Sequence, residues 1–185
     1  MISKKYLKDY RLEEKIDGSG RVKTKAVYIG GDYTVSPDFQ TGKKRLLLSL
    51  SVLSGLIFTG ALTPVSLAAR IIYVILPFVF SALPLSFMIT TAFSLFRAKG
   101  IMRREQAERI AYRLPVCTLA VLILTGVSFS GHIITAVVSW DSIPAGDMIY
   151  SMSLLVIIIL SAISFIKCKG LKAVALENHS VPPGK

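Results

Sequence analysis

Residues 71–96 read IIYVILPFVFSALPLSFMITTAFSLF, a run of 26 residues without Asp, Glu, Lys or Arg. Three further runs lack these four residue types, and they cover residues 46–62, 114–140 and 148–166. A helix that crosses the hydrocarbon core of a bilayer needs roughly 20 apolar residues. The four runs therefore predict an all-α integral membrane protein with four transmembrane helices.

The charges between these runs predict how the chain is oriented. Residues 1–45 carry eleven Lys and Arg, residues 97–113 carry six and residues 167–185 carry four, whereas the other two connections carry only Arg70. Lys and Arg near the ends of membrane helices are retained in the cytoplasm. We therefore expect a multi-pass protein of the cytoplasmic membrane, with both termini and the middle connection in the cytoplasm.

The net charge of +11 and the pI near 9.8 would suggest a nucleic-acid partner in a soluble chain. Membrane topology already accounts for this charge, and no basic stretch carries the interleaved aromatic residues on which bases stack. We expect the lipid bilayer, and not nucleic acid, to be the partner of the basic segments.

Two pairs of segments indicate an internal repeat. Residues 54–62 align with residues 125–133 at an offset of 71, and residues 91–101 align with residues 161–171 at an offset of 70. We interpret residues 43–101 and 114–171 as two tandem helical hairpins with the same orientation, joined by a basic loop over residues 97–113. Chance similarity between apolar helices of similar composition is the alternative. Small residues around Gly55 and Gly126 predict that the first and third helices meet at the centre of the bundle.

Two prolines distinguish the second apolar run from the fourth. Pro77 and Pro84 have no counterpart in the fourth run, and each proline frees a carbonyl one turn earlier. The second helix is therefore expected to bend, and both prolines are candidate functional residues that line a cavity. The alternative is a static kink in which Ser81 or a neighbouring helix binds the freed carbonyls.

His132 is the one histidine inside the apolar runs, and it stands where the first repeat has Ala61. An ionisable residue within a membrane segment is a candidate functional residue. A neutral histidine that is hydrogen-bonded to a hydroxyl such as Ser128 is the structural alternative.

The residues before the first apolar run predict a small cytoplasmic head over residues 1–42. Three short segments, residues 11–16, 21–29 and 32–35, are separated by two glycine-containing turns. This pattern predicts three strands of a β-meander at about residues 11–35. So small a sheet buries little surface, and we expect it to dock on another element. Six candidate partner-docking residues come from this head and from the middle loop: Tyr28, Ile29, Tyr33, Arg103, Arg104 and Arg109. The middle loop is expected to form a basic helix at the headgroup surface, and residues 172–185 a cytoplasmic tail.

The sequence lacks the residues that most membrane enzymes and exporters require. No run contains the carboxylate that relays protons in small exporters, Cys117 and Cys168 form no CxxC pair, and no zinc-protease or serine-hydrolase motif is present. We predict no catalytic residues, metal site or cofactor. The predicted function is a small accessory subunit that acts through contacts with a protein partner in a transporter or other membrane complex. The alternative is a homo-oligomeric channel or small-solute transporter without an intramembrane carboxylate.

Overall fold

The computed structural model describes residues 4–16, 22–35, 41–61, 71–98, 102–138 and 145–176. Four long apolar helices dominate it: α1 (Thr41–Ala61), α2 (Ile72–Arg97), α3 (Arg104–Val138) and α4 (Ala145–Cys168). Each is long and apolar enough to cross a bilayer, as the sequence predicts. The chain also forms a 3₁₀ helix, η1 (Lys4–Asp9), and the strands β1 (Tyr10–Ile16), β2 (Val22–Tyr28), β3 (Asp32–Val35), β4 (Met102–Arg103) and β5 (Ala173–Ala175).

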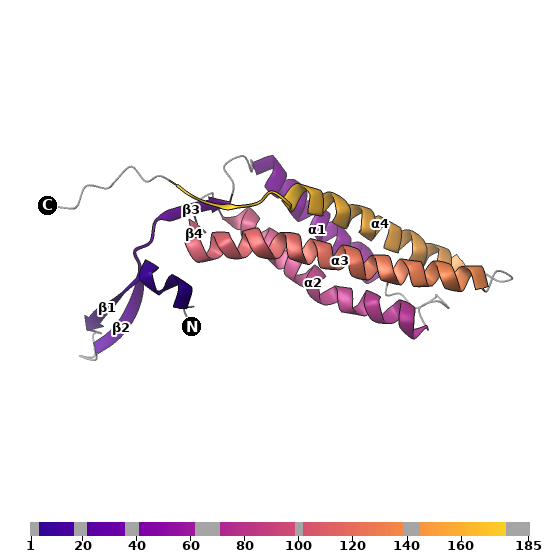
Figure 1. Cartoon of the computed structure of the whole chain (residues 1–185), viewed down its shortest axis with the longest axis horizontal. Coiled ribbons are helices and arrows are strands. Elements are labelled where there is room, and N and C mark those ends of the chain that lie inside the picture. The colour runs from indigo at the N-terminus through magenta and orange to yellow at the C-terminus, as the bar shows by residue number, and fades with distance from the viewer. Residues whose placement is uncertain are drawn as a thin grey trace.

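The helices form an up-and-down bundle in which α1 and α3 each pack against both α2 and α4 (Figure 1). The start of α1, the end of α2, the start of α3 and the end of α4 lie together with the strands, and we call this the strand-bearing end. The opposite end holds the connections from α1 to α2 and from α3 to α4. Both helical hairpins therefore start and finish at the strand-bearing end.

A layer of rings joins all four helices in the interior. Phe58 of α1 stacks on Phe78 of α2, with their ring centroids 4.4 Å apart. The Phe78 ring meets the edge of Tyr150 from α4 at 5.5 Å, and Tyr150 meets His132 from α3 at 5.6 Å. Aromatic pairs in these geometries add stabilisation beyond the area that they bury.

Small hydroxyl residues occupy much of the remaining interior. Most of them donate to carbonyls three or four residues earlier in their own helix, as Ser51 does to Leu47 at 2.7 Å and Thr125 does to Val121 at 2.7 Å. These hydroxyls are satisfied locally and let neighbouring helices approach. Large apolar side chains with no exposed surface, including Phe78, Met88 and Leu154, fill the space between them.

The outside of the bundle is apolar. Side chains such as Leu56, Leu83 and Val138 expose 65%, 64% and 80% of their surface. Large exposed apolar areas are unusual on a water-soluble monomer. Water is therefore an unfavourable surrounding for this bundle, whereas lipid would cover the same side chains.

The predicted three-stranded meander is wrong in its third strand. β1 and β2 form a two-stranded antiparallel hairpin, but β3 pairs with β4 and β5 in a separate sheet of order β4-β3-β5. The backbone N–H groups of Ile29 and Gly30 donate to the carbonyl of Asp9, which ties the end of β2 back to the start of β1. β3 instead packs on the bundle, where Val35 is almost completely buried.

The predictions for the middle loop and for the C-terminal tail also need correction. The segment predicted as a surface helix within loop 97–113 is the beginning of α3, because its apolar side, with Ala107 and Ile110, is buried in the bundle. The tail expected from residue 172 begins with β5, which pairs with β3. The remaining tail, from residue 177, lies outside the described residues.

The small-residue stripes of α1 and α3 do not meet at the centre. A Cβ added at Gly55 would lie 2.9 Å from Ile89 of α2, and one at Gly131 would lie 3.2 Å from the ring of Tyr73, also of α2. No described atom lies within 4 Å of such a Cβ at Gly126. The close approaches therefore join α1 and α3 to α2, and α1 and α3 occupy diagonal positions.

Candidate functional site

Four of the six candidate docking residues lie together at the strand-bearing end, where they join the head to the bundle. The hydroxyl of Tyr28 donates to the carbonyl of Gly31 at 2.9 Å and accepts from the backbone N–H of Arg104 at 3.1 Å. The guanidinium carbon of Arg103 lies 5.5 Å from the centroid of the Tyr28 ring. A tyrosine at the end of β2 thus connects the hairpin to the first residues of α3.

Arg104 contacts three separate elements. Its Nε donates to Glu108 at 2.9 Å, one turn later in α3, and its Nη1 lies 3.9 Å from a carboxylate oxygen of Asp9 at the end of η1. The guanidinium also lies 5.9 Å from the centroid of the Tyr33 ring in β3. Arg104 therefore contacts both η1 and β3 from the first turn of α3.

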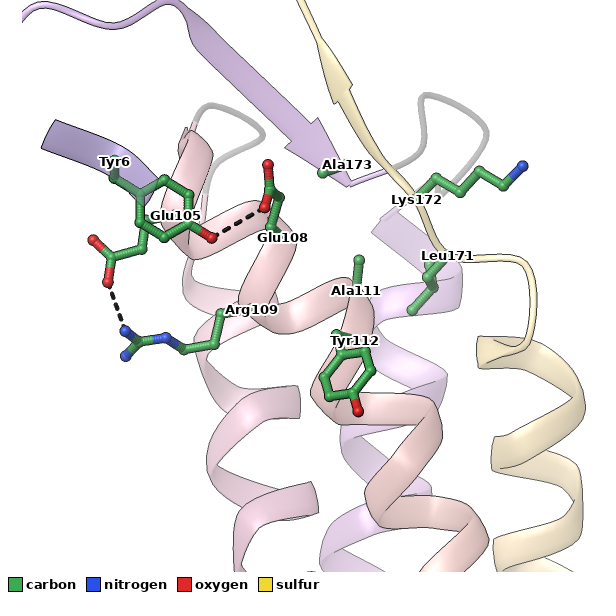
Figure 2. A pocket seen from close by; sticks show the side chains of 9 residues that line it. All are labelled: Tyr6, Glu105, Glu108, Arg109, Ala111, Tyr112, Leu171, Lys172 and Ala173. Carbon is green, nitrogen blue, oxygen red and sulfur yellow. Dashed lines mark hydrogen bonds and ion pairs between the residues drawn. The ribbon is translucent and has the colours of Figure 1, made fainter. Parts of the chain in front are cut away.

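A groove of about 680 Å³ opens beside these contacts, between η1, the first turns of α3 and the segment that leads into β5 (Figure 2). Tyr6 donates to Glu108 across the groove at 3.0 Å, and Arg109 donates to Glu105 at 2.6 Å. Figure 2 shows Lys172 extending away from the two acidic residues, Glu105 and Glu108. The charged groups that line the groove are thus largely paired with one another.

The two other candidate docking residues differ in setting. Ile29 follows β2 and exposes 59% of its surface, and it takes no part in the cluster around Arg104. Arg109 lies on α3 and borders both the groove and a second, smaller crevice between α2 and α3. The structure therefore brings Tyr28, Tyr33, Arg103 and Arg104 together and leaves Ile29 apart.

His132 lies near the opposite end of the bundle and is buried. Its ring packs against Tyr150, and it borders a largely apolar groove of about 410 Å³ between α3 and α4 that also contains Asp147. Its Nδ1 has no hydrogen-bond partner among the described residues. Ser128, the partner considered from the sequence, binds other groups.

The two prolines of α2 lie within a continuous helix. Ser128 of α3 donates to the carbonyl of Val74, three residues before Pro77, at 2.7 Å, and its oxygen lies 3.2 Å from the Tyr150 hydroxyl. Ser81 donates to the carbonyl of Phe78 at 2.6 Å. Pro77 leaves the carbonyl of Tyr73, four residues earlier, without its helical donor, and Ser128 donates to the next carbonyl instead. Ser81 likewise donates to Phe78 and not to Phe80, whose carbonyl Pro84 frees.

Several residues of both sites were not identified from the sequence. Asp9, Glu108 and Tyr6 belong to the Arg104 cluster, and Tyr150 and Asp147 accompany His132. The sequence offered one signal for these contacts, which is the spacing of Arg104 and Glu108. Residues four apart on a helix share a face, so an ion pair between these two could have been predicted. The other contacts join segments that are distant in sequence.

The described residues contain no group of three or more His, Cys, Asp or Glu side chains that could hold a metal ion. Comparisons with protein-family models, with curated protein sequences and with solved structures give no match to this chain.

Proposed function

We propose that the chain is a multi-pass protein of the cell membrane, with the strand-bearing end in the cytoplasm. The four apolar helices and their exposed apolar side chains support this placement. Every Lys and Arg of the described residues belongs to the strand-bearing end or to the turns of α3 next to it, which supports the orientation. The helix pairs α1–α2 and α3–α4 both start and finish at the strand-bearing end, which supports the interpretation of the bundle as a duplicated hairpin.

We further propose that the protein acts through protein contacts, as a small accessory subunit of a larger membrane complex. The observation that carries this proposal is the β1–β2 hairpin. Its register places Tyr10, Leu12 and Glu14 on one face opposite Tyr28, Ala26 and Thr24, and Val22 follows on the same face of β2. Leu12 and Val22 expose 71% and 60% of their surface, so this mostly apolar face, which we call the apolar face, is uncovered at these two positions.

A protein partner suits this hairpin better than the lipid surface does. An isolated two-stranded hairpin is marginally stable in water, and both of its outer edges present backbone N–H and C=O groups. Neither outer edge of β1 or β2 pairs with another described strand. A partner strand could satisfy those backbone groups while the partner covers the apolar face, whereas lipid could satisfy neither edge in a regular way.

The packed interior favours this role over a channel lined by α2. Phe78, Leu85 and Met88, on the inner side of α2 around Pro84, expose at most 3% of their surface. A conducting path needs a route that water or an ion can enter. In the alternative function, that path would have to run between copies of the chain.

The test compares two double variants of the full chain expressed in its native membrane. Leu12→Glu with Val22→Glu places charge on the apolar face, whereas Arg11→Gln with Glu13→Gln changes the opposite face and leaves the net charge unchanged. After extraction in mild detergent, we expect wild type and the control to retain one stoichiometric partner protein and the apolar-face variant to lose it. Retention of that partner by all three would remove the hairpin from the proposal. Purification of wild type only as a homo-oligomer would favour the channel.

A further inference from the structure

The crevice between α2 and α3 has the composition of an anion site at the edge of the apolar surface. It measures about 270 Å³ and lies between the last turns of α2 and the first turns of α3. Thr91 and Ser94 line it from α2, and Gln106, Arg109 and Arg113 line it from α3. These side chains offer guanidinium, amide and hydroxyl donors within one small volume.

Two of the donors are available for a ligand, and one cation is uncompensated. The side chains of Thr91 and Gln106 form no hydrogen bond with other described residues, and Arg113 forms no ion pair with them. Arg109 donates to Glu105, so its charge is largely balanced. The crevice therefore carries a net positive charge, supplied by Arg113.

Arg113 stands at the boundary between charged and apolar surface. It is the last charged residue before the apolar part of α3, and its guanidinium carbon lies 5.9 Å from the centroid of the Phe87 ring. Phe87 and Val116, which flank this level on α2 and α3, expose 45% and 47% of their surface. In a bilayer this boundary corresponds to the headgroup layer, where basic pockets between helices bind acidic headgroups.

We infer that this crevice binds the phosphate group of an anionic phospholipid, with the acyl chains extending over Phe87 and Val116. Arg113 supplies charge-assisted hydrogen bonds, and Thr91 and Gln106 supply neutral ones. The inference requires the helices to span a membrane, but it does not depend on the proposed role of the hairpin. Inorganic phosphate shares the headgroup chemistry and lacks the acyl chains, so it serves as the discriminating probe.

The experiment measures lipid binding to the full-length chain in detergent by native mass spectrometry. We expect phosphatidylglycerol to bind one to one and phosphatidylcholine to bind about tenfold more weakly, because the latter carries no net charge. Arg113→Gln should weaken phosphatidylglycerol binding about tenfold as well. The matched control is Arg97→Gln, which removes one exposed charge at the end of α2 outside the crevice and should leave the affinity unchanged.

A second variant keeps the test informative if Arg113→Gln fails to fold. Gln106→Glu preserves the size of an exposed side chain and places a negative charge in the crevice, so it should also abolish the preference for phosphatidylglycerol. Equal losses in Arg113→Gln and Arg97→Gln would show diffuse attraction to the basic surface and overturn the site. Equal affinity for phosphatidylcholine would overturn it too. Displacement of the lipid by equimolar inorganic phosphate would overturn the lipid assignment and leave a phosphate site.

Discussion

The hydroxyl of Ser128 on α3 donates a hydrogen bond of 2.7 Å to the carbonyl of Val74 on α2, in the turn that precedes Pro77. Proline removes one N–H donor from the helix and disturbs the carbonyls of the preceding turn. Ser128 therefore binds, from another helix, the carbonyl next to the one that Pro77 leaves without its helical donor, which is that of Tyr73. The oxygen of Ser128 also lies 3.2 Å from the Tyr150 hydroxyl, so one side chain connects α2, α3 and α4.

Ser128→Ala should lower the free energy of unfolding by about 1 kcal/mol, because hydrogen bonds between membrane helices average about 0.6 kcal/mol and this residue makes two contacts. Ser130→Ala is the matched control, since its hydroxyl donates only to Gly126 of its own helix. Thermal unfolding in detergent should show a lower Tm for Ser128→Ala alone. The same Tm for both variants would mean that another group satisfies Val74.

The sequence predicted the helices well because their signal is local. Apolar length alone identifies α2 and α4, and no distant contact is required to recognise them. The prolines likewise predict which carbonyls lose their helical donors, but only the packed bundle shows that Ser128 donates to Val74, one residue after the carbonyl that Pro77 frees. The identity of a contact between helices depends on their rotation and order, which the composition of each helix does not specify.

The head shows more clearly that contacts between distant segments could not be predicted from the sequence. Residues 11–16 and 21–29 were predicted as the first two strands, and β1 and β2 pair with each other there. The partner of β3 was missed because β4 and β5 have two and three residues and no periodicity of their own. They form strands because β3 lies beside them at the end of the bundle. For the same reason, Arg104 was predicted as a partner-docking residue, and its contacts with η1 and β3 within the chain were missed.

The proposed orientation predicts the accessibility of two glycines in a chain whose cysteines have been replaced. A cysteine at Gly146, near the start of α4, should react with a membrane-impermeant maleimide added to intact cells. A cysteine at Gly170, just after α4, should react only after the membrane is permeabilised. The reverse order of labelling would place the strand-bearing end, and with it the head, outside the cytoplasm.

His132→Ala tests whether partner docking depends on the region around His132. The ring is buried against Tyr150, so its removal leaves a cavity that should cost about 2 kcal/mol of stability. An accessory subunit that docks through its head should still retain its partner at the wild-type ratio. Loss of partner retention in a variant that still forms the four-helix bundle, judged by its circular dichroism, would transfer the docking role to the region around His132.

Arg104→Ala should loosen the head without unfolding the bundle. The substitution removes the contacts of the guanidinium with Glu108, Asp9 and Tyr33, but it preserves the backbone N–H that donates to Tyr28. Exposed ion pairs contribute little individually, so the head should remain attached and open more often. Amide hydrogen exchange in β2 and β3 should become severalfold faster, while exchange in α2 and α4 stays at the wild-type rate.

The matched control for this variant is Arg109→Ala, because the one ion pair of Arg109 among the described residues is with Glu105, one turn earlier in α3. Arg109→Ala removes the same charge about one and a half turns further along α3. Amide exchange in β2 and β3 should therefore stay at the wild-type rate. If both variants accelerate exchange in the head equally, net charge rather than the specific contacts of Arg104 holds it in place. If neither does, the Tyr28 hydroxyl and the pairing of β3 with β5 are sufficient to hold the head on the bundle.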